Sequence, residues 1–268
     1  MTTAPAAQKA FDERAFGLNA LGWVVFFSLL ALWQIGATVA ASPSTATFTE
    51  AVAAAVQLLT GPPLITHILP SLARMLAGFA IAAISGIVVG LVIGTFRRAD
   101  PWVRPSLEFF RAVPPSLIIP IVLLVFGLGD QLVIFVISFG AFWPVLLNTI
   151  DGARRVEPLF LETARSLRLS VSRTLVSVII PAALPTILAG LRVALSISLI
   201  LMVVAEVLAS NSGIGYLISL SQQTFDVAGT YGGVLLLATI GWLFDTLFVL
   251  IERRVLRSHN TRQGAHSV

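Results

Sequence analysis

The 268-residue chain contains no cysteine, and this absence excludes disulfides and thiolate metal sites. Its three histidines, His67, His259 and His266, are too scattered to predict a metal cluster, and no HExxH or paired-aspartate signature accompanies them. The single lysine, Lys9, follows no glycine-rich loop, so there is no Walker A motif to cradle nucleotide phosphates. We therefore predict that this chain is not an enzyme, has no catalytic residue, and binds neither a metal nor a cofactor of its own.

Charged residues are also scarce. They make up 11% of the chain against 57% hydrophobic residues, and the mean hydropathy is +0.94, which is far from the values of a soluble domain. The isoelectric point of about 10.6 could suggest nucleic-acid binding, but the arginines cluster at the ends of apolar runs, as the positive-inside rule requires. We predict an all-α membrane protein that does not bind nucleic acid.

Six apolar runs are long enough to cross the hydrocarbon core of a bilayer as helices. They cover approximately 21–41, 71–95, 105–128, 132–149, 182–209 and 231–250. The four inner regions of this arrangement hold fourteen Lys and Arg residues and the three outer loops hold none, which predicts that both termini are cytoplasmic. The first run is longer than a signal-peptide core, so we expect an uncleaved span, although Val39-Ala40-Ala41 leaves signal cleavage open.

Small residues and prolines predict how these spans pack and bend. Small residues at every fourth position let helices approach closely, and they are Gly78, Ala82, Gly86, Gly90 and Gly94 in the second span and Thr186, Gly190, Ala194 and Ser198 in the fifth. Pro114, Pro115 and Pro120 interrupt the third span, which we interpret as a kinked helix beside a pathway, with a static kink as the alternative. In the first outer loop, Thr47 and Glu50 form a capping-box pattern before a short amphipathic helix.

A long polar segment, residues 151–181, separates the fourth and fifth spans. It contains five arginines, at positions 154, 155, 165, 168 and 173, and is therefore expected in the cytoplasm. Pro158 is well placed as a first helical residue, and Ser170 or Ser172 could cap a second helix. We predict two short helices docked at the inner membrane surface.

This segment resembles the coupling loop of permease subunits of bacterial ABC importers. Glu162-Thr163-Ala164, followed by Val178-Ile179-Ile180-Pro181, is similar to the "EAA, then Gly, then I-x-L-P" pattern of that family. Other strings resemble its nitrate, sulfonate, taurine and bicarbonate branch, namely 69–79, 111–115, 142–148, 181–192 and 204–206. Thr163 replaces the usual second alanine. Arg168 stands where the family has a glycine that ends the helix in a left-handed turn, and a non-glycine residue there costs about 1 kcal/mol.

The resemblance implies a division of the chain and a mechanism. It implies a cytoplasmic tail at 1–20, a first span and external amphipathic helix at 21–66, a type-1 permease domain at 67–253 and a cytoplasmic tail at 254–268. The permease would move a small anion, such as a sulfonate, taurine or nitrate, across the bacterial inner membrane by alternating access. An ATP-independent secondary transporter or channel is the alternative, although no convincing internal repeat supports it.

The resemblance also implies partners and coupling residues. The partners would be two copies of a cytoplasmic ATP-binding subunit, which would hold ATP and Mg, a second copy of this chain, an external solute-binding protein and the lipid bilayer. The expected ATPase-coupling residues are Glu157, Leu159, Glu162, Thr163, Ala164, Arg165, Leu167, Arg168 and Pro181. Among them Glu162 would pair with a basic residue of the ATPase, while Ala164 and Leu167 would fill its groove.

Ionisable residues at membrane depth are candidate functional residues because they are costly unless paired or wet. Arg192 lies about 16 Å of helix beyond Pro181, and it either faces a water-filled pathway or braces neighbouring helices through their carbonyl groups. Glu206, nearer the outer end, either makes a structural hydrogen bond or faces an outer vestibule. Glu108 and Arg111 are spaced to pair along one helix. The candidate pathway residues are Pro114, Pro115, Asn148, Arg192 and Glu206.

Overall fold

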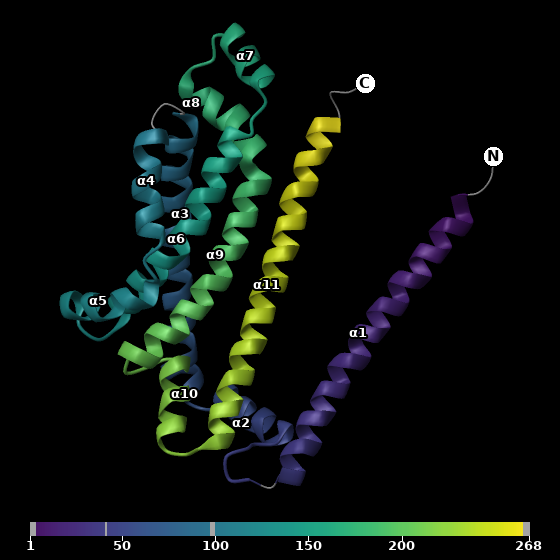
Figure 1. The fold of residues 1–268 in the computed structure, drawn as a ribbon, viewed down its shortest axis with the longest axis vertical. Helices are drawn as coiled ribbons and strands as arrows, with labels where there is room; N and C mark the ends of the chain where they lie inside the picture. Colours follow the sequence, from purple (N-terminus) through teal and green to yellow (C-terminus); the bar gives the residue numbers. More distant parts are fainter. Residues whose placement is uncertain (1–3, 41, 97–99, 265–268) are drawn as a thin grey trace.

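The computed structural model describes residues 4–40, 42–96 and 100–264, with side chains at 21–40, 42–96 and 102–256 (Figure 1). In these ranges every regular element is helical, so the predicted all-α class is confirmed. The α-helices are α1 (Ala4–Ala40), α2 (Phe48–Thr60), α3 (Leu69–Thr95), α4 (Asp100–Arg111), α5 (Ile119–Phe126), α6 (Asp130–Arg154), α7 (Pro158–Ser166), α8 (Val171–Thr174), α9 (Ile180–Ala209), α10 (Ile214–Gln223) and α11 (Val227–Gly264). Two π-helical turns, Leu64–Ile68 and Leu175–Ile179, and a 3₁₀ turn, Pro115–Ile118, complete the described elements.

Five helical segments are long and apolar enough to cross a membrane, and a sixth span results if one bent pair is counted as a unit. The five are Leu21–Ala40, Leu64–Thr95, Asp130–Arg154, Val171–Ala209 and Val227–Leu256. The bent pair joins Trp102–Arg111 to Pro115–Phe126 at an angle of 78°. Its break lies at Pro114, whose extended backbone (φ −61°, ψ 127°) separates α4 from the 3₁₀ turn. The kink predicted from the prolines is therefore present.

The core of the molecule is a row of three helices, with α6 packed between α3 and α9. The α3 glycines make this approach possible: a Cβ atom at Gly86 would lie 2.9 Å from Val145 Cβ of α6, and one at Gly90 would lie 2.7 Å from Thr149 Cβ. On the other side of α6, a Cβ at Gly190 would lie 2.7 Å from Asn148 Cβ. Both predicted small-residue stripes therefore face α6.

The first and last long helices lie outside this row. In Figure 1, α1 diverges from the bundle, and its side chains from Leu21 to Ala40 are exposed or half-buried. It contacts α2, and its Trp33 ring lies 5.8 Å from the Tyr231 ring of α11. α11 packs on α2 and α10 and leans away from α9 toward its C-terminal end (Figure 1). The helices α1 and α11 continue into the predicted tails at 1–20 and 254–268, of which 1–3 and 265–268 are outside the described residues.

One end of the molecule, the α10 end, carries α2 and α10 (Figure 1). The predicted capping box starts α2: the Thr47 hydroxyl accepts from the Glu50 backbone N–H at 3.3 Å, and the Thr47 backbone N–H donates to the Glu50 carboxylate at 2.8 Å. The helix α10 was not predicted, because glycines at 213 and 215 favour a turn. Gly213, with a φ of 123°, is instead the N-cap that redirects the chain into α10.

Candidate coupling surface and membrane-embedded charges

The opposite end, the α7 end, is formed by the short helix α7 and its flanking turns (Figure 1). Glu157 is the extended N-cap, and Pro158 occupies the first helical turn, as predicted. Arg168 adopts a left-handed φ of 51°. Its backbone N–H bonds to the Arg165 carbonyl at 2.9 Å, and the Leu169 N–H bonds to the Ala164 carbonyl at 3.0 Å, which together make a Schellman motif. The turn expected of a glycine is therefore made by an arginine.

The outer side of α7 is apolar and exposed. The side chains of Leu159, Phe160 and Leu167 are 66%, 53% and 67% exposed, and Glu162 is exposed beside them. Leu159, Glu162 and Leu167 were expected at this surface, whereas Phe160 was not. Its position in the first turn of α7, next to Leu159, is the signal that could have identified it. An exposed ridge of this kind is suited to insertion into a groove on another protein.

Ala164 faces the other way, which corrects the expectation that it would fill a partner's groove. It is 3% exposed, and it lines a cavity of about 240 Å³ beneath α7 together with Gly94, Thr95 and Ala153. Leu161, one turn earlier in α7, packs against the cluster that contains Ala153 of α6 and Ile179, the last residue of the π turn before α9. These contacts attach α7 to the core helices. Ala164 and Leu161 therefore connect α7 to the spans.

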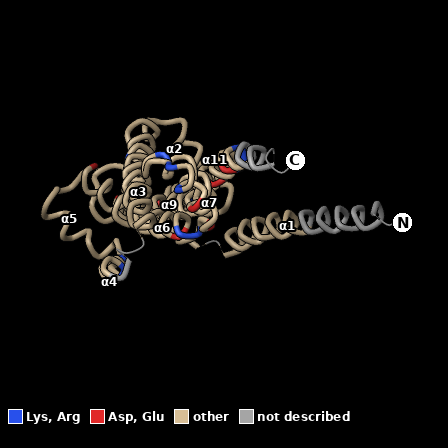
Figure 2. The backbone as a smooth tube through the Cα atoms, turned by 90° about the horizontal axis from the view of Figure 1, so that it is seen from above, with Lys and Arg blue, Asp and Glu red and all other residues tan. Residues whose placement is uncertain are grey.

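The remaining predicted coupling residues surround this helix. Thr163 donates its hydroxyl to the Leu159 carbonyl at 2.8 Å and is exposed, as is Arg165 at the mouth of the cavity. Ser170 caps the short helix α8, as predicted, and α8 continues through the π turn into α9 as one helical segment, Val171–Ala209. Pro181 lies in the first turn of α9, directly after that π turn. Figure 2 shows blue Lys and Arg positions around α7.

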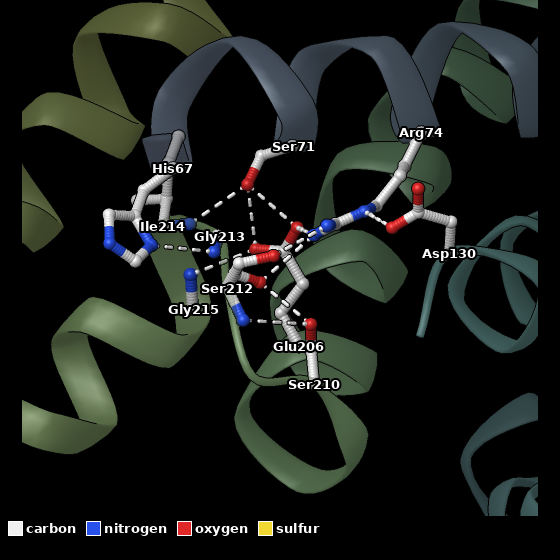
Figure 3. A network of polar contacts seen from close by, with 10 residues as sticks. All are labelled: His67, Ser71, Arg74, Asp130, Glu206, Ser210, Ser212, Gly213, Ile214 and Gly215. Carbon is white, nitrogen blue, oxygen red and sulfur yellow. Dashed lines mark hydrogen bonds and ion pairs between the residues drawn. The ribbon is translucent and has the colours of Figure 1, made fainter. Parts of the chain in front are cut away.

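At the α10 end, a buried ionic network surrounds Glu206 (Figure 3). Glu206 is 0% exposed, and its carboxylate accepts hydrogen bonds from Ser71 Oγ at 2.6 Å, from Arg74 Nη1 at 3.0 Å and from the Gly215 backbone N–H at 3.0 Å. Arg74 also donates to Asp130 Oδ1 at 2.7 Å. The network thus ties α3, α6, α9 and α10 together, and Glu206 is a structural residue, which was one of its two predicted roles.

The edge of this network is closed by a histidine (Figure 3). The Gly213 backbone N–H donates to His67 Nδ1 at 3.1 Å, and the His67 ring stacks on Tyr216 with its centroid 5.9 Å away. Arg74 completes the loop by donating to the Ser212 carbonyl at 2.9 Å. The chain between α9 and α10 is therefore held by His67 of the π turn before α3 and by Arg74 of α3.

A second ion pair joins α9 to α11. Arg192 Nε lies 2.9 Å from Asp245 Oδ1, and Arg192 Nη2 lies 3.0 Å from Asp245 Oδ2. The side chains are 46% and 47% exposed. Arg192 therefore pairs with the carboxylate of Asp245, a partner that was not predicted, rather than with the backbone carbonyl groups of neighbouring helices. The signal was available, because each of these two spans carries a charged residue of opposite sign. The expected Glu108–Arg111 ion pair is not present among the described side chains.

The predicted pathway residues do not form a single site. Pro115 packs against Gly140 of α6, where a Cβ atom would lie 3.0 Å from its ring, and Pro114 marks the break before it. Asn148 lies over Gly190 and donates to the Pro144 carbonyl at 2.8 Å. The contacts of Asn148 are therefore at the α6–α9 interface, away from the α11 side of α9 where Arg192 is paired.

Solved structures place this arrangement of helices in a known class. The structure is similar to the inward-facing MetNI methionine ABC transporter, with a TM-score of 0.63 and 18% identity, covering 74% of this chain and 99% of that chain. An amino acid ABC transporter solved with histidines gives a TM-score of 0.55 at 19% identity, covering 74% and 97%. The fold is therefore that of the membrane-spanning domain of an ABC transporter.

The sequence comparisons then give the family. The chain belongs to the family described as "Binding-protein-dependent transport system inner membrane component", whose model matches residues 86–257. It is 33% identical to the putative aliphatic sulfonates transport permease protein SsuC of Bacillus subtilis, over 98% of this chain and 96% of that protein. It is 37% identical to the bicarbonate transport system permease protein CmpB of Synechococcus elongatus, over 70% and 68%. The predicted resemblance and the multi-pass inner-membrane location are confirmed.

Proposed function

We propose that this chain is the membrane subunit of an ATP-driven importer and is moved by a separate ATPase that grips α7. The observation that carries this proposal is the exposed apolar ridge of Leu159, Phe160 and Leu167, which lies at the α7 end between the candidate spans Asp130–Arg154 and Val171–Ala209. The Schellman turn at Arg168 fixes the direction of this helix. ATP and Mg would bind to the partner, and two copies of each chain would form the transporter.

The solute is proposed to be a small oxyanion. The relatives are described as permeases for aliphatic sulfonates and for bicarbonate, which share a compact anionic group bearing several oxygens. An external solute-binding protein would deliver such a solute to the α10 end. ATP binding would draw the two ATPase subunits together, and the attached core helices would then switch the opening from outside to inside.

Reconstitution tests this proposal. The chain is placed in proteoliposomes with its ATP-binding subunit enclosed and its solute-binding protein outside, loaded in turn with ethanesulfonate, taurine, nitrate or bicarbonate. Uptake of at least one of these anions is expected only when ATP is enclosed. Uptake that continues without any ATPase subunit would contradict the proposal and would identify a secondary transporter or channel.

A further inference from the structure

The ion pair between Arg192 and Asp245 lies within two membrane spans. Arg192 is about 18 Å of helix beyond the start of α9, and Asp245 is about 10 Å of helix before Glu252, the next charged residue of α11. An ion pair at this depth is costly in contact with lipid, because hydrocarbon solvates neither charge. Both side chains are nevertheless about half exposed, at 46% and 47%. The pair therefore requires water or another polar group beside it.

The arginine of the buried ion pair at the α10 end uses more of its hydrogen-bond donors than Arg192 does. There, Arg74 is 6% exposed and bonds to Glu206, Asp130 and Ser212, so its donors are occupied from several sides. Toward the side chains that the structure describes, Arg192 donates through Nε and Nη2 only, whereas a guanidinium carries five N–H donors. Arg192 thus presents further donors on its exposed side.

We propose that Arg192 binds the oxyanion group of the transported solute and that Asp245 is the resident counter-ion that this solute displaces. This inference rests on the proposed function, since it assigns a solute contact within the importer. The ligand class is a small anion with at least two neighbouring oxygens, such as a sulfonate, carboxylate, nitrate or bicarbonate. The two Asp245 oxygens occupy the positions that such a group would take on the guanidinium fork.

The half-exposed setting makes such an exchange energetically feasible. An ion pair in contact with water contributes little net free energy, so replacing one carboxylate by another oxyanion costs little. When no solute is present, Asp245 neutralises Arg192 and avoids a bare charge within the span. When the solute moves on, the carboxylate returns and displaces it. Asp245 would therefore weaken anion binding while allowing release.

Opposite effects of two substitutions that each remove one charge distinguish this role from simple bracing. The purified complex of the chain with its ATPase is titrated calorimetrically with ethanesulfonate, nitrate and bicarbonate, and with uncharged dimethyl sulfone as a control. Asp245→Asn should bind at least one of the anions about tenfold more tightly than wild type, and Arg192→Gln about tenfold more weakly, since one charged hydrogen bond corresponds to about that factor. Dimethyl sulfone should show no difference.

The double variant Arg192→Gln/Asp245→Asn is the control for misfolding, because its two neutral amides can still hydrogen-bond to each other. It should remain monodisperse and co-purify with the ATPase subunit but show weak anion binding. Weaker or unchanged binding in Asp245→Asn, or wild-type binding in either variant that carries Arg192→Gln, would overturn the proposal. ATP-driven uptake by the wild-type complex reconstituted in proteoliposomes tests the proposed function separately.

Discussion

Arg168 forms a turn that normally requires glycine, and its φ of 51° is disfavoured because the Cβ atom crowds the following carbonyl. We expect Arg168→Gly to stabilise the Schellman turn after α7 by about 1 kcal/mol. Backbone amide hydrogen exchange at Leu167 and Leu169 should slow by about fivefold, the factor that corresponds to this free energy. Arg165→Gly, one turn earlier in helical backbone, is the control and should speed exchange instead. Faster exchange in Arg168→Gly would show that the arginine side chain itself holds the turn.

Glu206 is the buried partner on which the network at the α10 end depends. Glu206→Ala leaves the guanidinium of Arg74, only 6% exposed, without its buried carboxylate. We expect a loss of about 3–5 kcal/mol in stability, because an unpaired buried charge is costly, and a lower thermal unfolding temperature in detergent. Asp130→Ala removes the other carboxylate, which is 68% exposed, and should cost less than about 1 kcal/mol. Equal losses in the two variants would contradict this ranking.

Among the elements, α3 and α6 approach so closely that their contact tolerates no added side chain. A Cβ atom at Gly90 would lie 2.7 Å from Thr149 Cβ and 3.0 Å from the Leu146 carbonyl oxygen. We expect Gly90→Val to destabilise the chain by about 1–3 kcal/mol through overpacking, measured as thermal unfolding in detergent. Gly36→Ala in α1 is the matched control, since nothing lies within 4 Å of its Cβ position, and it should be neutral or stabilising.

The start of α2 should respond to pH. Hydrogen bonds from the Thr47 backbone N–H and then from its hydroxyl lower the pKa of Glu50. Because the folded-state pKa lies below the unfolded value, the contribution of this carboxylate is fully present above the unfolded pKa and is lost as pH falls through the folded pKa. Hydrogen exchange of α2 amides should therefore lose protection in that acidic window. Glu50→Gln should abolish this pH dependence, and Thr47→Ala should cost α2 about 1 kcal/mol at neutral pH.

The helix-level prediction from sequence worked where the pattern was long and regular. The glycine repeat of α3 and the Thr47 capping box were both predicted because spacing alone defines them. The helix α10 was missed because glycines at 213 and 215 are compatible with either a turn or a helix start. The continuity of α8 with α9 was missed because a π turn leaves no clear residue signature.

Pairings between distant segments were harder to predict. Arg192 and Glu206 stand out in the sequence because each lies within a long apolar run, but the sequence does not indicate which residues they bond to. Asp245 is 53 positions from Arg192, and Ser71 is 135 positions from Glu206, so only the packing of the helices brings them together. The burial of Ala164 was likewise missed, because which face of α7 meets the core depends on where α6 and α9 end.

At the scale of the whole molecule, α7 is attached to the row of core helices at one end and the ionic network closes that row at the other. Leu161 connects α7 to Ala153 and Ile179, and the small-residue contacts hold α3, α6 and α9 together. The proposed coupling requires a packed connection of this kind between α7 and the row.

The most direct measurement is ATP-dependent uptake by Leu159→Glu in the reconstituted transporter, compared with Leu59→Glu on α2. Both substitutions put a carboxylate on an exposed leucine, one at the α7 end and one at the α10 end. We expect Leu159→Glu to lose ATPase co-purification and to slow uptake at least about tenfold, because it would lie at the centre of the interface, while Leu59→Glu retains both. Normal ATPase binding and uptake in Leu159→Glu would refute the proposed role of α7.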